Sequence, residues 1–347
     1  MNLTRHQLRT WVLPPAGVFL VLLVVMYYIF WIPNSVPEPG GRVVAIPRGA
    51  TFKAVTDTLA NNGVIRSRFA FDLAGRILGY TKRIKVGKYV FHSGLSNSDI
   101  LKDINEGKSR LIISVVIPEG WRMDQIARRF ARELGVDFGK IMEICRDSSY
   151  VASKGFRAPT LEGYLLPDTY NFYWQTDEPE IVERMVNGFR NFFVDSLQHR
   201  LLDVHMSLNQ AVTLASIVQG ESGIDAELPI IAGVYLNRLR RNMRLEADPT
   251  IQYIIPGNPR RLLNNDLRIP SPYNTYLNYG LPPGPVNNPG RQSILSVLYP
   301  EKNQYLYFVA TGVGGHHFSR TYAEHQRAVR AYKHVRREML RNLHQSG

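Results

Sequence analysis

A glutamate at the end of an apolar segment is the residue in this chain best suited to acid–base chemistry. Residues 207–223 read SLNQAVTLASIVQGESG, and Ser207 and Gln210 have the spacing of a capping box, which predicts a helix that begins near Leu208. Apolar residues would cover most of the circumference of this helix, as is typical of a helix inside a core. Glu221 is the first charged residue of the helix and extends its apolar stripe.

This position would change the acidity of Glu221. A low-dielectric environment and the negative end of a helix dipole both penalise a charged carboxylate, so both raise its pKa. A glutamate needs such a raised pKa to act as a general acid near neutral pH. The alternative interpretation of the same pattern is a glutamate that turns into solvent and has no catalytic role.

A second group of candidates lies in a long irregular stretch, residues 245–290, which is rich in Pro, Asn and Gly. Long ordered loops are usually functional, and these amide, hydroxyl and aromatic side chains could line a groove for a sugar. Equally, the segments Asp-Pro-Thr and Ser-Pro-Tyr-Asn-Thr could be turns whose hydrogen bonds are only structural. The candidate supporting residues, one of them from the preceding helix, are Asn237, Asp248, Thr250, Ser271, Tyr273 and Asn274. The wider set of groove candidates also includes Tyr253, Asp266, Thr275 and Tyr276.

Motifs for other chemistries are absent from the sequence. There is no Walker A loop, no G-x-S-x-G elbow and no H-E-x-x-H pair. The single cysteine, Cys145, excludes an internal disulfide and a multi-cysteine zinc site. His316 and His317 are adjacent without the spacing of metal ligands, so we expect them to form hydrogen bonds or to face the substrate. The sequence therefore predicts neither a metal nor a cofactor.

The N-terminal residues predict a membrane anchor. Arg5 and Arg9 precede an uncharged, mainly apolar run at residues 12–32, and about twenty apolar residues are enough to span a bilayer as a helix. No small-residue cleavage site follows, so we expect the anchor to be retained. Positive charge upstream of the run places the N-terminus in the cytoplasm and the remaining chain outside the inner membrane.

The net charge of +13 over 347 residues suits an anionic partner such as nucleic acid, an anionic membrane surface or an acidic polymer. The basic helix predicted at residues 321–343 is interpreted first as a solvated face. Nucleic acid is not expected as a partner because most of the chain would lie across a membrane from the chromosome.

The expected fold class is α+β, with an internal repeat. The turn Ile46-Pro47-Arg48-Gly49 returns as Ile117-Pro118-Glu119-Gly120, and each copy would contain two strands and two helices. The predicted helices of the repeat are residues 51–61, 98–105, 122–134 and 178–189, and its later strands start at Gly87 and Gly163. Downstream we expect helices at 207–221 and 226–241 and a buried strand at 305–310. The predicted domains are an anchor (1–35), a first module (42–115), a second repeat or connecting region (116–195) and a mainly helical catalytic domain (196–347).

Several segments, in this order, resemble the MltG-type (YceG-like) endolytic murein transglycosylases. They are LEGYLLPDTY, LASIVQGESG, IAGVYLNRL, MRLEADPTIQY, SPYNTY, GLPPGPVNNPG and YLYFVATGVGGHHFS. The resemblance runs from about Arg42 to the C-terminal helix and implies a LysM-like N-terminal region. It also implies that the catalytic glutamate is Glu221. This chain departs from the family's usual pattern at Gln219, Gly220, Glu246 and Ala247.

The resemblance implies cleavage of the bond between N-acetylmuramic acid and N-acetylglucosamine in peptidoglycan, with 1,6-anhydro ends as products. Two alternatives stay open: a hydrolase in which Asp248 or Glu246 serves a water molecule, and a noncatalytic wall-binding scaffold. The expected partners are glycan strands, the membrane and glycan polymerases acting beside the anchored protein.

Overall fold

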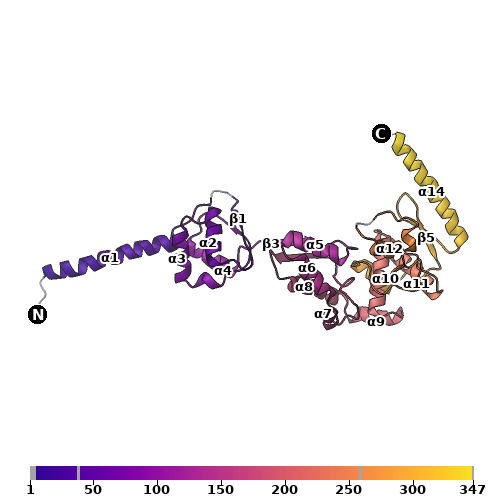
Figure 1. Ribbon diagram of the computed structural model, residues 1–347, viewed down its shortest axis with the longest axis horizontal. Coiled ribbons are helices and arrows are strands. Elements are labelled where there is room, and N and C mark those ends of the chain that lie inside the picture. The colour runs from indigo at the N-terminus through magenta and orange to yellow at the C-terminus, as the bar shows by residue number, and fades with distance from the viewer. Residues whose placement is uncertain (1–4, 37–39, 258–259, 346–347) are drawn as a thin grey trace. The chain divides into compact units, whose positions relative to one another are not determined.

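The computed structural model describes residues 5–36, 40–257 and 260–345, without the side chains of 5–15, 195, 339–340 and 342–345. The chain forms two compact units that interleave in sequence. The first is Met1–Ser114 with Glu133–Gly135 and Asn171–Thr176, and the second contains the remaining residues. Figure 1 traces the elements of both units.

The first unit contains a long N-terminal helix, a pair of strands and short helices beside them (Figure 1). In chain order its elements are α1 (Arg5–Trp31), β1 (Arg42–Ile46), α2 (Phe52–Asn61), α3 (Arg68–Ile77), η1 (Tyr80–Lys82), β2 (Gly87–Phe91) and α4 (Asn97–Glu106). β1 and β2 are antiparallel, with Val44 opposite Tyr89, and both of these side chains are buried. The helices α2, α3 and α4 begin at a capping hydroxyl of Thr51, Ser67 and Ser96, respectively.

The end of α1 is part of this unit's core. Ile29 and Phe30 are buried in the same hydrophobic cluster as the inward residues of β1 and β2. Two carbonyl groups at the C-terminal end of α1 accept hydrogen bonds from side chains. Asn97 Nδ2 donates to Ile29 O at 2.8 Å, and Ser98 Oγ donates to Phe30 O at 3.0 Å. The first turn of α4 thus satisfies carbonyl groups that a helix C-terminus otherwise leaves unpaired.

The predicted membrane anchor begins at Val12, and the side chains of residues 5–15 lie outside the described part of the chain. Within the residues that are described, no single helix has the length and hydropathy of a membrane span, and the apolar stretch Ala16–Trp31 is shorter. The helices Ser196–Asp203 and Leu208–Glu221 have the length and hydropathy of a membrane span only when they are taken together, and the angle between them is 86°.

The second unit is mainly helical. Its elements include α5 (Met123–Leu134), α6 (Phe138–Arg146), α7 (Ser148–Ser153), α8 (Glu178–Phe192), α9 (Asp195–Asp203), α10 (Leu208–Glu221), η2 (Asp225–Glu227), α11 (Leu228–Arg240), α12 (Asp248–Ile254), η3 (Asp266–Arg268), α13 (Arg291–Leu298), β5 (Tyr307–Ala310), β6 (His316–Ser319) and α14 (Tyr322–Gln345). β5 and β6 are antiparallel and α14 packs against both. Two further strands, β3 (Ile112–Val116) and β4 (Thr169–Tyr173), pair with each other.

The helix α10 lies at the centre of this unit. Residues 211–218 are all buried, and the helix packs against α9, α11, α12 and α13. Its start is fixed locally: Ser207 Oγ accepts from Gln210 N, and Gln210 Oε1 accepts from Ser207 N, which is the predicted capping box. The predicted buried helix is therefore confirmed and ends at Glu221, with Ser222 in an extended conformation after it.

The α+β class is confirmed, and the two Ile-Pro-x-Gly segments adopt the same turn. Gly49 and Gly120 have φ of +77° and +75°, and each turn lies between a strand and a helix. The strand predicted at Gly163-Tyr164 is wrong: Gly163 has φ of +89° in a turn, and β4 begins later, at Thr169. The strand expected at 305–310 is shorter, Tyr307–Ala310, and its residues are half-buried rather than buried.

We expect Ser207→Ala to lower the free energy of unfolding by about 1 kcal/mol, since it removes the hydroxyl that caps α10. Urea denaturation followed by circular dichroism measures this loss. Ser196→Ala, at an exposed position on α9, is the control. An unchanged midpoint for Ser207→Ala would show that the cap does not contribute.

Candidate active site

Glu221 is the last residue of α10, and its side chain faces a cavity of about 360 Å³. Residues 211–218 of the helix are buried, while Glu221 is partly accessible and lines the cavity. The carboxyl group thus lies at the carbonyl end of an apolar helix and can still be reached by a ligand. This is the position that the sequence predicts for a general acid.

Tyr235 holds the Glu221 carboxyl group in place. This tyrosine comes from α11, is 2% exposed, and donates from its Oη to Glu221 Oε1 at 2.6 Å. Its ring contacts Phe308 of β5 edge-to-face at 5.9 Å between centroids. Three elements of the second unit therefore fix the orientation of one carboxyl group.

The pKa of Glu221 is raised to about 7, mainly by burial and to a smaller extent by the negative charge of Asp248. The hydrogen bond from Tyr235 and the charge of Arg238 act in the opposite direction and lower this pKa. The net result is a carboxyl group that is about half protonated at neutral pH. Such a group can both donate and accept a proton under the same conditions.

Asp248 reaches the cavity because two helix ends pack closely. A Cβ atom added at Gly220 would lie 2.6 Å from Pro249 Cγ, so only a glycine lets the start of α12 approach the last turn of α10. Asp248, the residue before this proline, lines the cavity with Glu221. Its Oδ1 accepts from Tyr276 Oη at 2.5 Å.

A buried arginine supports the loop on another side of the cavity. Arg238 Nε donates to Leu306 O at 2.7 Å, and its Nη1 donates to Leu245 O at 2.9 Å and to Glu246 Oε2 at 3.1 Å. Glu246 has φ of +50°, a left-handed conformation that side chains rarely adopt. Glu246, a position at which the chain departs from the pattern that it resembles, is thus held by an ion pair with Arg238.

Two histidines also line the cavity. His316 Nδ1 lies 2.7 Å from Glu227 Oε2, so this ring is engaged by a carboxylate. His325, in the first turns of α14, stacks on Tyr307 at 5.2 Å between centroids. Its Nδ1 is buried and has no hydrogen-bond partner in the described part of the chain, and burial lowers the pKa of His325 below its usual range. A neutral imidazole with an unpaired nitrogen can bond to a polar ligand here.

The chain is similar to known proteins over most of its length. A family model described as the YceG-like family matches residues 44–331, which is most of the chain. The chain belongs to the YceG-like family. It is 31% identical over 305 residues to the endolytic murein transglycosylase of Bacillus subtilis (strain 168), covering 83% of this chain and 84% of that protein.

Two further relatives extend this comparison of the YceG-like chain. It is 28% identical to the endolytic murein transglycosylase of Streptococcus pneumoniae (strain D39), of whose length it spans 57%. It is 31% identical to a yceG-like protein from Listeria monocytogenes with a 2.6 Å crystal structure, with a TM-score of 0.60. That match covers 84% of this chain and 99% of the Listeria chain.

The sequence predicts six supporting residues for this YceG-like protein. Among the described residues, Asp248 is the one of these six that lines the cavity with Glu221. Three of the others form hydrogen bonds within the stretch of residues 245–290. Thr250 Oγ1 is 2.9 Å from Thr275 Oγ1, and Ser271 Oγ accepts from Tyr273 N. Asn274 Nδ2 donates to two loop carbonyls. These contacts match the structural-turn alternative that the sequence left open.

Two predicted residues lie elsewhere. The amide of Asn237 points to the segment after α13, where Nδ2 donates to Asn303 O and Tyr305 O, each at 3.0 Å. The ring of Tyr273 contacts that of Tyr253 at 4.9 Å. The structure does not place either beside Glu221.

The sequence missed Tyr235, Arg238, Phe308 and His325 as cavity residues. A partial signal existed for Tyr235 and Arg238, because both lie in the segment IAGVYLNRL that supports the family resemblance. His325 lies on a helix whose basic residues suggested only a solvated face.

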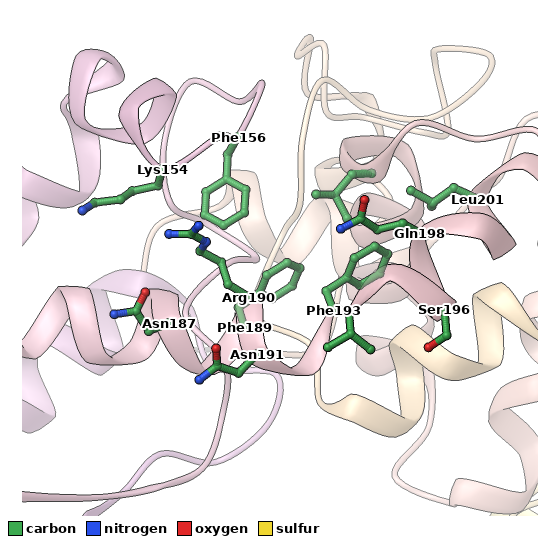
Figure 2. Close-up of a pocket in the computed structure, with 13 residues that line it drawn as sticks. Lys154, Phe156, Asn187, Phe189, Arg190, Asn191, Phe193, Ser196, Gln198 and Leu201 are labelled. Atoms are coloured by element: carbon green, nitrogen blue, oxygen red, sulfur yellow. The ribbon is translucent and has the colours of Figure 1, made fainter.

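A larger cavity, of about 800 Å³, lies between the ends of α7 and α8 and the start of α9 (Figure 2). Its floor includes the buried rings of Phe156, Phe189 and Phe193. Lys154, at its edge, forms an ion pair with Glu183. No carboxylate lines it in the described chain, so its size does not make it a site for acid catalysis.

Replacing Tyr235 with phenylalanine should raise the pKa of Glu221, because it removes a hydrogen bond that favours the charged carboxylate. If protonated Glu221 is the catalytic acid, activity falls as pH rises through its pKa. The variant's descending limb should therefore move to higher pH, by about 0.5–1 unit. The measurement is kcat against pH on purified glycan strands.

Tyr299→Phe, at an exposed position outside the cavity, is the matched control and should leave the limb in place. A Tyr235→Phe limb that stays in place, or moves to lower pH, contradicts the role assigned to this hydrogen bond.

Proposed function

We propose that this protein is a membrane-anchored endolytic lytic transglycosylase that cleaves bonds between N-acetylmuramic acid and N-acetylglucosamine within peptidoglycan strands. Membership of the YceG-like family and relatives named endolytic murein transglycosylase support this assignment. The observation that carries it is the Glu221 carboxyl group, which has a pKa of about 7 and faces a cavity lined with polar groups.

In the first step, protonated Glu221 donates its proton to the glycosidic oxygen as the bond from that oxygen to the anomeric carbon breaks. Positive charge develops on the sugar ring, as in other glycosidic cleavages. The hydrogen bond from Tyr235 favours the carboxylate that Glu221 becomes.

In the second step, ionised Glu221 accepts the proton of the muramic 6-hydroxyl group, whose oxygen then bonds to the anomeric carbon. The product carries a 1,6-anhydro ring, no water is consumed, and Glu221 ends the cycle protonated. Because the nucleophile belongs to the substrate, one carboxyl group is sufficient.

Asp248 gives a specific reason to consider a second function, a two-carboxylate hydrolase, since it lines the same cavity. Its Oδ1 is bound by Tyr276 and Glu246 is paired with Arg238, so both carboxylates already have partners. We therefore assign Asp248 to the orientation of Tyr276 and of the substrate. A noncatalytic scaffold would not need an acid with a raised pKa.

We also propose that α1 anchors the chain in the inner membrane, with the N-terminus in the cytoplasm. The support is its apolar sequence and the exposed aromatic residues Tyr27, Tyr28 and Trp31 near its end. The first unit would be a LysM-like module that binds glycan, supported by its order of strand, helix, helix and strand. The proposed domains are 1–35, 42–115, 116–195 and 196–347, and glycan polymerases are the proposed partners.

The substitution Glu221→Gln should abolish cleavage while the fold and the binding of glycan strands are kept, because glutamine has the shape of glutamate but cannot supply the proton. Mass spectrometry of digested peptidoglycan should detect 1,6-anhydro ends with the unaltered protein and none with the variant.

Glu301→Gln, at an exposed position, is the matched control. Full activity of the Glu221→Gln variant would contradict the assignment of Glu221 as the catalytic acid. Products that carry an added water and reducing ends would instead favour the hydrolase.

A further inference from the structure

A second cavity, with both polar and apolar lining residues, lies next to the candidate active site. Its volume is about 350 Å³, and it is formed by the start of α5, the last turn of α10, α12 and residues 286–287. The lining side chains that matter here are Arg122, Gln125, Arg128, Pro249, Tyr253 and Asn287.

At two places in the chain, one residue lines the second cavity and the residue next to it in sequence lines the active-site cavity. Gly220 lines this cavity and Glu221 the other, while Pro249 lines this cavity and Asp248 the other. Neighbouring Cα atoms are about 3.8 Å apart, so the cavities are separated by little more than one backbone. A polymer whose scissile bond lies at Glu221 would bring the substituents of that sugar close to the second cavity.

The second cavity carries a net positive charge, because two arginines but only one carboxylate, Asp124, line it among the described residues. Arg122 Nε and Arg128 Nη2 share a single carboxylate, that of Asp124, at 3.2 and 3.4 Å. The buried acid Glu162, which interacts electrostatically with Arg122, is 4% exposed and accepts from Met123 N and Asn288 Nδ2. Burial raises the pKa of Glu162 to about 8, so it is mostly neutral at pH 7 and does not offset the arginines.

One residue that lines the cavity, Asn287, carries a buried hydrogen-bond acceptor without a donor among the described residues. Asn287 is 6% exposed, and its Nδ2 donates to Ser216 O at 2.8 Å, which fixes the direction of the amide. Its Oδ1 has no partner among the described residues. A buried acceptor without a donor is costly, and a ligand that carries an N–H group would remove that cost.

These features together describe a ligand with a carboxylate, an amide N–H and an apolar part that packs on Pro249 and Tyr253. In peptidoglycan this combination is found on the stem peptide attached to muramic acid, whereas the sugars themselves carry no carboxylate outside that attachment. We propose that the second cavity binds the stem peptide of the strand being cleaved, with a peptide carboxylate at Arg122 and Arg128. This inference rests on the proposed function, because it places the strand at Glu221.

The test compares two glycan strands, one with its stem peptides and one from which an amidase has removed them. Equilibrium binding is measured with the full chain carrying Glu221→Gln, so that no strand is cleaved. Adding Arg128→Gln should raise the dissociation constant for the peptide-bearing strand about tenfold, which corresponds to about 1.4 kcal/mol. Binding of the stripped strand should stay within twofold.

The matched control is Arg184→Gln, which removes another exposed arginine paired with an acid one helical turn away, and should change neither value. Arg122→Gln is the second variant and should show the same selectivity as Arg128→Gln. Arg128 is 68% exposed, so its loss is not expected to unfold the chain.

Equal weakening for both strands would mean that the cavity binds sugar or attracts the polymer without selectivity, and would overturn the proposal. No weakening for either strand would overturn it as well. Cleavage of the stripped strand by the unaltered protein tests the proposed function separately. Selective binding of the peptide-bearing strand without any cleavage would contradict the proposed transglycosylase function but support the proposed peptide site.

Discussion

The arrangement depends on one carboxyl group that is kept mostly out of water at the end of a buried helix. The core around α10 supplies the low dielectric, and the carbonyl end of the helix adds to the penalty on the charged form. Tyr235 limits that penalty, because its hydrogen bond favours the carboxylate. The balance of these opposing effects leaves Glu221 able to give and take a proton near neutral pH.

The loop between α11 and α13 contributes mainly by its shape. Buried bonds such as that between Thr250 and Thr275 hold it against the core, and the close approach of Pro249 to Gly220 brings Asp248 to the cavity. The polar residues of the loop therefore act largely through the backbone they support. The same approach of two helix ends creates the boundary between the two cavities, so one glycine influences both.

Features with a local cause could be predicted from the sequence. The start of α10 follows from a capping box and its burial from apolar residues on all sides, and both were found. The strand expected at Gly163 failed because a glycine in a left-handed turn and a glycine in a strand look alike without their neighbours. Tyr235 and His325 line one cavity with Glu221 only through packing between distant elements, which no periodicity within one segment reveals.

The pKa of Glu221 is the quantity that tests this account most directly. Carbon-13 NMR titration of glutamate carboxyl groups, with the Glu221→Gln variant to assign the resonance, measures it in the folded chain. The account predicts a midpoint of about 7. A midpoint near the ordinary glutamate value of about 4.3 would mean that the carboxyl group is fully hydrated, and would contradict its role as the acid.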